Sequence, residues 1–388
     1  MVELNSEELM LAETMYKWAV NEIAPIQEEI DEEDRLPDGF FKKLGDLGML
    51  GITIDEKYGG SGQGILMQTL AVEQLSRISP ALGMTYGAHS NLCANNIHKN
   101  GNEAQKSKYL PPMCTGERVG ALCLTEPNAG SDALGGMRTV AMKDDGSYRM
   151  NGTKMFITNG NIAGTLLVYA KTAPELGAHG ISAFIVDADT PGVSVSRKLK
   201  KCGMRGSPTC ELVFEDVPVP AENLLLAENQ GVAVVTSGLA YERIVLSGGS
   251  LGMAEQALQY SVQYAKEREQ FGRPIKDFEM IQQKIADMYC LVEASRGLVY
   301  RAARFADGPE GKRGGKGTEL DKLAAAAILF AAESATKVAC EGIQIHGGYG
   351  YCLEYPIQKL WRDAKLYEIG AGTSEIRRII IARELFRD

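Results

Sequence analysis

Glu242 is the residue in this sequence that is best placed to act as a base. It lies near the centre of the most apolar stretch of the chain, Val232 to Ala254, and this stretch predicts a helix buried in protein. Burial raises the pKa of a carboxyl group toward neutral pH, as the removal of a weakly acidic C–H proton requires. A structural pair with Arg243 or another cation is the alternative, but adjacent helical residues point about 100° apart, which makes a direct pair with Arg243 unfavourable. We therefore expect Glu242 to take up a proton.

A second polar segment has the composition of a ligand-binding loop. Residues 122–132 read LCLTEPNAGSD, in which backbone amides and the hydroxyls of Thr125 and Ser131 can hydrogen-bond a polar heteroaromatic ring. An ordinary hairpin loop is the alternative, because Asn, Gly, Ser and Asp also form turns. The Gly-rich run at 58–64 lacks the preceding strand and the following Lys-Ser/Thr of a phosphate-binding loop, so we interpret it as a connector.

The histidines and cysteines do not have the spacing of a metal site. No histidine lies at metal-ligand spacing from another, and the eight cysteines contain no C-x-x-C. We expect no bound metal, and scattered cysteines in a long chain indicate reduced thiols in a cytosol-like compartment. The four histidines are His89, His98, His179 and His346.

The spacing of apolar residues, which predicts the helices and strands that position these side chains, changes along the chain. Residues 6–120 are predicted to be helical, and Ser79 is expected to cap a helix that begins at Pro80. Short runs broken by Gly, Asp-Gly and Asn-Gly then predict an antiparallel barrel or sandwich, and the helical period returns from residue 231. The expected helices are 7–33, 38–47, 64–78, 80–98, 232–265, 278–306, 319–345, 356–364 and 373–386. The expected strands are 121–125, 139–142, 148–150, 154–158, 165–171, 182–186, 193–197 and 210–217.

These periods divide the chain into three domains of an α+β protein. We expect an N-terminal all-α domain over 1–121, a middle β domain over 122–230 and a C-terminal α-helical bundle domain over 231–388. Within the bundle, the run GPEGKRGGKG at 308–317 predicts a flexible, basic surface loop.

Charge and hydropathy exclude several classes of protein. The net charge of −9 over 388 residues argues against a nucleic-acid binder that neutralises phosphates. The N-terminal run lacks the basic and apolar regions of a secretory signal and the Arg/Ser bias of a transit peptide. No window of about 20 residues is free of polar interruption, so we expect no integral membrane contact. A cytoplasmic protein of bacterial type is favoured, with a processed mitochondrial matrix form as the alternative.

Five segments together resemble the acyl-CoA dehydrogenase family over essentially the whole chain. They are LCLTEPNAGSD (122–132), KMFITNG (154–160), AYERIVLSGG (240–249), REQFGRPI (268–275) and RDAKLYEIGAGTSEIRR (362–378), with QIHGGYGY (344–351) in support. The resemblance implies an N-terminal helical domain, a middle antiparallel β-barrel and a C-terminal four-helix bundle. It also implies FAD as cofactor, an acyl-CoA as substrate and a homotetramer, because the family shares its FAD sites between subunits.

The resemblance places FAD against several separate segments. Phe156 occupies the position of the family's usual Trp against the flavin face, and Arg268 and Phe271 would reach the FAD of a neighbouring subunit. Glu279 replaces a Gln of the family, and its carboxylate would repel a diphosphate. The expected cofactor-binding residues are Leu122, Leu124, Thr125, Gly130, Ser131, Phe156, Ile157, Thr158, Arg268, Phe271, Glu279, Gln344, Ile345, Gly347, Gly348, Thr373, Ser374 and Glu375.

The usual catalytic position of the family holds an alanine in this chain. Most members have a Glu immediately before the Gly-Thr of the C-terminal motif, where this chain has Ala371. The resemblance therefore implies that Glu242 is the base, as in the isovaleryl-CoA and long-chain branches, and the EIGAGTSE run resembles the isovaleryl branch most closely. The backbone N–H of Ala371 would still hold the thioester oxygen, together with a flavin ribityl hydroxyl. The expected substrate-binding residues are Ser131, Tyr241, Arg243, Gly370, Ala371 and Gly372.

The acyl group and the electron acceptor stay open at this stage. Gly370 and Ala371 leave room for a β-branched chain such as isovaleryl, although small residues also permit a tight turn. Ala240 and Ala233 replace an Asp and a Tyr of the isovaleryl pattern, so a long-chain or alicyclic acyl group is an alternative. An electron-transfer flavoprotein is the expected acceptor. The competing functions are an acyl-CoA oxidase that uses O₂ and a non-catalytic scaffold that binds acyl-CoA or flavin.

Overall fold

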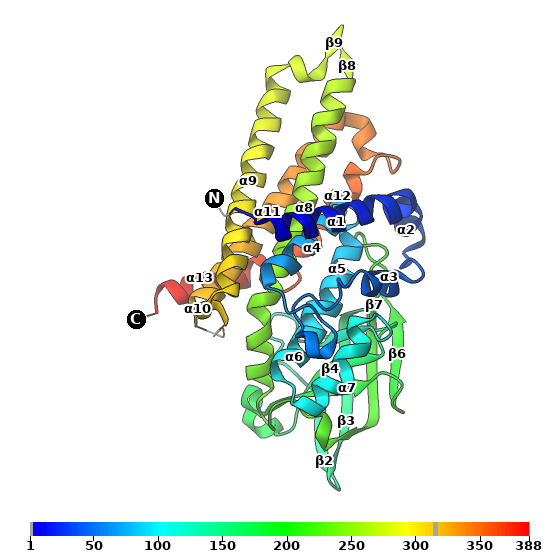
Figure 1. The fold of residues 1–388 in the computed structure, drawn as a ribbon, viewed down its shortest axis with the longest axis vertical. Helices are drawn as coiled ribbons and strands as arrows, with labels where there is room; N and C mark the ends of the chain where they lie inside the picture. The colour runs from blue at the N-terminus through cyan, green and yellow to red at the C-terminus, as the bar shows by residue number, and fades with distance from the viewer. Residues whose placement is uncertain (1–2, 313–316, 388) are drawn as a thin grey trace.

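One long helix, α8 (Gly231–Glu267), runs along most of the length of the molecule (Figure 1). The computed structural model describes residues 3–312 and 317–387. At 1.5 Å per residue the 37 residues of α8 extend for about 55 Å. The sheet lies beside the beginning of α8, whereas the hairpin of β8 (Glu269–Gln270) and β9 (Arg273–Pro274) follows its end at the opposite pole of the molecule. The helix therefore connects two distant regions in which functional residues are predicted.

The N-terminal region is helical, as predicted, but two of the expected helices are interrupted. Pro25 has no amide hydrogen to continue α1, so the expected helix over 7–33 divides into α1 and α2. The expected helix over 80–98 contains a π-helical segment, Ala88–Asn95, and Ser79 precedes it without a side-chain capping bond. The α-helices are α1 (Ser6–Glu22), α2 (Gln27–Glu33), α3 (Phe40–Asp46), α4 (Ile65–Ile78), α5 (Pro80–Gly87), α6 (Asn96–Asn100) and α7 (Glu103–Cys114).

The middle region forms a seven-stranded sheet in the order β1-β4-β2-β3-β7-β6, with β5 on β4. The prediction of purely antiparallel pairing was wrong in two places, because β1 and β2 both pair with β4 in parallel. Two runs predicted as separate strands are the single bulged strand β3. The strands are β1 (Gly120–Cys123), β2 (Val140–Asp144), β3 (Ser147–Thr158), β4 (Thr165–Lys171), β5 (Ile181–Asp187), β6 (Val193–Lys198) and β7 (Thr209–Pro220).

The C-terminal region is the predicted helical bundle, built on α8. Helix α11 packs against α8, α9, α12 and α13, and its many alanines allow close approach on all sides. Part of the predicted loop forms a short helix, α10 (Pro309–Lys312), and residues 313–316 of that loop lie outside the described residues. The other helices are α9 (Glu279–Asp307), α11 (Glu319–His346), α12 (Ile357–Tyr367) and α13 (Ser374–Leu385).

One stretch passes a test for membrane spans, which the sequence analysis did not expect. Residues Glu319–Tyr351 include an 18-residue window with a mean hydropathy of 1.5, and 56% of that window is buried inside the protein. A helix enclosed by other helices has the same apolar composition, so a single such helix is weak evidence for a membrane span.

Helices α4 and α8 approach each other so closely that glycine is required between them. A Cβ atom on Gly252 would lie 2.2 Å from the carbonyl oxygen of Glu73, and one on Gly248 would lie 2.6 Å from that of Thr69. A larger side chain at either position would have to push the two backbones apart. The glycines of α8 therefore hold the N-terminal helices against the helix that contains Glu242.

A buried ion pair fixes the loop after β1 to strand β3. The ammonium of Lys154 lies 2.9 Å from the carboxylate of Glu126 and donates a hydrogen bond to the carbonyl of Leu124. Glu126 also accepts hydrogen bonds from the backbone amides of Arg138 and Thr139. Burial raises the pKa of Glu126, but Lys154 and these donors outweigh burial and hold it below its ordinary value. The loop is thus anchored by fully satisfied charges.

Lys154→Met is expected to destabilise the protein strongly. The substitution leaves the Glu126 carboxylate buried without its cation, which costs about 3–5 kcal/mol in the free energy of unfolding. Urea denaturation at neutral pH measures this loss. Arg149→Met is the matched control, since Arg149 lies on the same strand in a half-exposed pair with Asp144, worth about 0–1 kcal/mol. Equal losses in the two variants would show that the buried pair does not anchor the loop.

Candidate functional site

Glu242 is buried on α8 without a hydrogen-bond partner. Its exposed fraction is 8%, and no residue within 3–312 or 317–387 donates a hydrogen bond to its carboxylate. Burial raises the pKa of Glu242 to about 7, while the guanidinium groups of Arg243 and Arg377 act in the opposite direction. Tyr169 faces it from β4, and burial, Cys93 and the charge of Glu242 together raise the pKa of this phenol. Glu242 therefore changes its charge close to neutral pH.

The residues on either side of Glu242 have partners elsewhere in the protein. Arg243 donates a hydrogen bond of 2.8 Å to Asp321 on α11. Tyr241 donates to the carbonyl of Gly311, and its ring lies 3.3 Å from the ammonium of Lys99. The expected poor geometry of a Glu242–Arg243 pair agrees with these contacts. The roles of Tyr241 and Arg243 as substrate contacts stay predictions.

The predicted oxyanion residue, Ala371, lies in a strained turn between α12 and α13. Ala371 has a φ of 57° and Gly372 a φ of 87°, and the left-handed conformation costs about 1–2 kcal/mol for a residue with a Cβ. Gly370 and Ala371 are both half-buried. The turn is held by Arg377, whose Nη2 donates a hydrogen bond of 2.6 Å to the carbonyl of Gly370. Strain that the surroundings maintain in this way is typical of functional turns.

The first residues of α13 form a conventional helix N-terminus. The hydroxyl of Thr373 accepts a hydrogen bond from the amide of Ile376, as an N-cap residue does. Ser374 is buried, and Glu375 is exposed with a pKa lowered by hydrogen bonds from a backbone amide and from Thr373. The positive end of this helix suits a diphosphate, so the predicted role of these three residues is compatible with their positions.

The loop after β1 and the end of β3 together present a polar and aromatic face. The amide of Met155 donates to the carbonyl of Thr125 and so joins the two segments. Phe156 is 65% exposed and has a φ of 60°, at an irregularity in the pairing of β3 with β7. A bulky residue with positive φ is a genuine outlier. An exposed aromatic ring held in this conformation fits a flavin that stacks on it.

The other predicted residues of this face differ in their exposure. Gly130 and Ser131 are exposed, and a Cβ added at Gly130 would meet no atom within 4 Å. Ile157 is 2% exposed and its side chain packs into the sheet, so only its backbone is available to a ligand. The half-buried members of the set are Leu122, Leu124, Thr125 and Thr158.

A second group of predicted FAD residues lies at the far end of α8. Arg268, Ile345, Gly347 and Gly348 line one hollow of about 410 Å³. Tyr264 stacks on His346 in its wall, with ring centroids 4.2 Å apart. Gln344 and Glu279 are exposed and outside this lining, and Phe271 is 94% exposed with a φ of 52°.

Helix α8 separates the two groups of predicted FAD residues. Arg268 lies about 39 Å along the helix axis from Glu242, at 1.5 Å per residue. The structure therefore does not bring Arg268 and Phe271 together with Glu242 in one chain.

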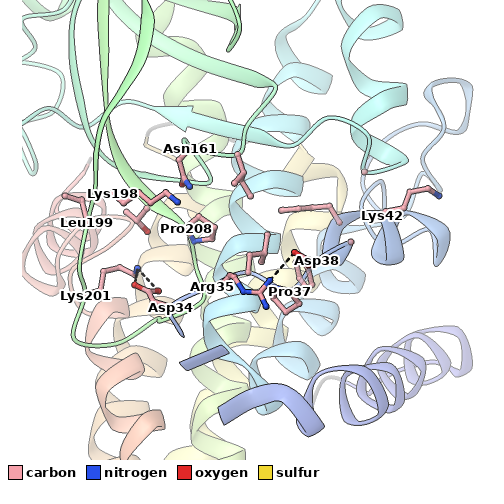
Figure 2. A pocket seen from close by; sticks show the side chains of 17 residues that line it. Asp34, Arg35, Pro37, Asp38, Lys42, Asn161, Lys198, Leu199, Lys201 and Pro208 are labelled. Carbon is pink, nitrogen blue, oxygen red and sulfur yellow. Dashed lines mark hydrogen bonds and ion pairs between the residues drawn. The ribbon is translucent and has the colours of Figure 1, made fainter. Parts of the chain in front are cut away.

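A hollow of similar size between the N-terminal helices and the sheet contains none of the predicted site residues. It is lined by the segment from Asp34 to Lys42 and by parts of β6 and β7 (Figure 2). Its cations are largely paired, because Lys201 contacts Asp34 and Arg35 contacts Asp38. Nothing in this lining resembles an acid–base pair. Among the described residues, no cluster of three His, Cys, Asp or Glu forms a candidate metal site.

Three residues of functional interest were missed in the sequence. Glu126 lies in the segment 122–132 and Lys154 in the segment 154–160. The bulge in β3 interrupts the alternation of its side chains, so the sequence did not show that Lys154 points inward. Arg377 follows Ser374 and precedes Ile380 at helical spacing, and all three are buried. An arginine on the buried stripe of an amphipathic helix was therefore the available signal.

Comparison with known sequences assigns all three regions of the chain to one family. The N-terminal, middle and C-terminal domains of acyl-CoA dehydrogenases match residues 5–117, 121–217 and 229–386. The isovaleryl-CoA dehydrogenase of Oryza sativa subsp. japonica is 50% identical over 97% of this chain and 90% of its own length. The 2-methylacyl-CoA dehydrogenase of Solanum tuberosum is 47% identical over 99% of this chain and 92% of its own length. Relatives include both mitochondrial and bacterial proteins, so either predicted compartment is possible.

Comparison with solved structures gives the same result. Butyryl-CoA dehydrogenase from Megasphaera elsdenii has a TM-score of 0.95 and 40% sequence identity, with 100% of both chains covered. Solved complexes of similar chains contain the flavin. The predicted fold class is confirmed, and the exposed ring of Phe156, the anchored loop after β1 and the Arg268 hollow all fit FAD. The chain belongs to the acyl-CoA dehydrogenase family, a family of oxidoreductases that use FAD.

Proposed function

We propose that this protein converts a short branched acyl-CoA into the 2-enoyl-CoA, with Glu242 as the base. The observation that carries the proposal is that Glu242 is buried with a pKa of about 7, while the usual base position is Ala371. The α-proton passes to the carboxylate of Glu242. The β-hydrogen leaves with its electron pair, and FAD supplies the acceptor for that hydride. Loss of both hydrogens forms the C=C bond.

The turn at Ala371 has the features needed to acidify the α-proton. A carboxylate removes a C–H proton efficiently only when the neighbouring thioester carbonyl is polarised. The backbone N–H of Ala371 donates a hydrogen bond irrespective of the side chain, and the tether from Arg377 to Gly370 fixes the turn. The alanine thus provides the donor while Glu242 provides the base.

We also propose that a complete FAD site needs a second copy of the chain. Arg268 lies about 39 Å along the axis of α8 from Glu242, and Phe271 follows in the hairpin beyond the end of this helix, at the pole opposite the sheet (Figure 1). The nearly full exposure of Phe271 is unfavourable in an isolated chain and is explained if a neighbouring subunit and its FAD cover the ring. A symmetric assembly of four chains satisfies this requirement.

The proposed acyl group rests on the volume of the same turn. Gly370 and Ala371 contribute little side-chain volume to this turn, which suits a short chain with a branch. The named substrates of the two similar dehydrogenases, isovaleryl-CoA and 2-methylacyl-CoA, are both branched. We propose an electron-transfer flavoprotein as the acceptor, since Phe156 keeps the flavin edge of the site near the surface.

Glu242→Gln is expected to abolish the reduction of bound flavin. The amide preserves the shape of the side chain but cannot take a proton, so the reductive rate should fall by about 10²–10⁴-fold. Anaerobic stopped-flow measurement of the bleaching of the oxidised flavin band gives this rate. Glu267→Gln, the same change at an exposed position on the same helix, is the control and should react as the parent does. Unchanged bleaching by Glu242→Gln would support a non-catalytic scaffold.

The reductive rate is expected to rise with pH through about 7 and then to level off. Burial raises the folded-state pKa of Glu242 to about 7 from an ordinary value of 4.5, and only the ionised form accepts a proton. The same shift makes the stability contribution of Glu242 fully present below about 4.5 and lost as the pH rises through 7. Single-turnover rates and urea midpoints between pH 5 and 9 measure the two effects, with Glu242→Gln as reference. A rate that is already maximal at pH 5 contradicts the assignment.

Short branched acyl-CoAs are expected to reduce the flavin faster than straight or alicyclic ones. A panel of butyryl-, isovaleryl-, 2-methylbutyryl-, octanoyl- and cyclohexanoyl-CoA, scored by flavin bleaching, tests this order. Faster reduction by straight chains would refute the inference from Gly370 and Ala371. The reduced samples are then exposed to air as a control. Slow reoxidation is expected of a dehydrogenase, whereas rapid reoxidation with peroxide would identify an oxidase.

A further inference from the structure

Arg377 is a wholly buried cation with unused donors. Its exposed fraction is 0%, and it is the largest fully buried side chain among the described residues. Nη2 donates to the carbonyl of Gly370 at 2.6 Å, whereas Nε and Nη1 have no partner within residues 3–312 and 317–387. Burial and the nearby charge of Arg243 lower its pKa to about 10, so it stays protonated at neutral pH. A buried charge with free donors costs free energy of folding, so its presence calls for a functional explanation.

Three carboxylates face Arg377, and two of them already have cations. Glu333 on α11 lies 2.7 Å from Arg378, and Glu368 at the end of α12 lies 2.7 Å from Lys365. The third is Glu242 on α8, and each of the two residues affects the pKa of the other. Among these three carboxylates, Glu242 is therefore the one without a cation in direct contact.

The cation next to Glu242 on its own helix, Arg243, lowers the pKa of Glu242 more than Arg377 does, but Asp321 neutralises part of its charge. Arg243 is held by Asp321 at 2.8 Å, and Arg383 also approaches Asp321, at 3.4 Å. Arg383 is also paired with Glu384, at 2.9 Å, so with Glu242 neutral the two buried arginines Arg243 and Arg377 have one carboxylate in close contact, that of Asp321. Ionisation of Glu242 therefore relieves the excess of positive charge.

We propose that Arg377 is a positioning residue that serves the base and the oxyanion turn together. Its Nη2 fixes Gly370, and with it the amide of Ala371, while its buried positive charge favours the ionised form of Glu242 without a direct ion pair between them. The proposal rests on the proposed role of Glu242 as the base.

The planar fork of arginine allows this double role. Its donors point in different directions in one plane, so Nη2 can hold the Gly370 carbonyl while Nε and Nη1 stay free and the charge still acts on Glu242. A lysine at this position would keep the positive charge but has one compact ammonium on a flexible stem. The charge and the geometry of Arg377 can therefore be separated by substitution.

Arg377→Gln and Arg377→Lys are expected to change different properties of the enzyme. Arg377→Gln removes the charge, so the rise of the reductive rate should move up by about one pH unit or more, which is a tenfold loss at pH 7. Arg377→Lys keeps the charge, so the reductive rate should rise over the same pH range as in the parent. The rate on the plateau at high pH should be lower. Arg378→Gln is the matched control, because Arg378 is the exposed neighbour that pairs with Glu333. It should change neither property.

A second measurement follows the protonation of Glu242 directly, without turnover of substrate. The carboxyl absorption of Glu242, identified by infrared difference against Glu242→Gln, should titrate at higher pH in Arg377→Gln holoenzyme. An unshifted titration and an unshifted rate profile in Arg377→Gln would overturn the proposal. If Arg377→Gln does not fold, Arg377→Lys decides: a lower plateau with an unshifted rise supports the proposal, and a parental plateau overturns it.

The two proposals can fail separately. If Glu242→Gln reduces flavin normally, Glu242 is not the base and both proposals are wrong. If Glu242→Gln is inactive but Arg377→Gln keeps the parental pH profile, Glu242 remains the base and Arg377 has only a structural role.

Discussion

The site depends on a carboxylate that must ionise where water cannot solvate it. Burial raises the pKa of Glu242, and the guanidinium groups of Arg243 and Arg377 lower it, so the balance of these effects is about 7. A stronger cation contact would make Glu242 too weak a base for a C–H proton, and a drier site without cations would keep it protonated. Asp321 moderates this balance because it neutralises much of the charge of Arg243. Four buried or half-buried charges are therefore needed to set one proton affinity.

The position of the base on α8 links its environment to the packing of the helices. A carboxylate on a surface loop would be solvated, whereas α8 is clamped against α4 by glycine contacts and enclosed by α11. The same helix continues to the opposite pole, where Arg268 and Phe271 are too far away to serve the Glu242 site of their own chain. The length of α8 thus also places part of the predicted cofactor contacts far from the proposed base, and the proposed assembly of chains would resolve this separation.

The sequence predicted the class of fold, which is confirmed, but not the contacts around the proposed base. Helices and strands followed from the change of period near residues 120 and 231, and the alanine at position 371 led to the prediction of Glu242 as the base. The break at Pro25 and the parallel pairing of β1 with β4 were missed, since a local pattern does not encode which strands become neighbours. Arg377 was missed for the same reason: it is buried where α13 packs against α11, and its bond to Gly370 depends on the turn between α12 and α13.

Separation of the base from the oxyanion turn has a physical consequence for the turn itself. A Glu at position 371 would have to adopt the left-handed conformation that Ala371 has at a φ of 57°, and would bring a second negative charge close to Glu242. With alanine, the turn only has to present an amide, and its strain is maintained by the hydrogen bond from Arg377 to Gly370. The base then gains its burial from a rigid helix instead of from a strained turn. In the proposed arrangement, the proton affinity of Glu242 and the geometry of the Ala371 amide are set by different elements, and the guanidinium of Arg377 acts on both.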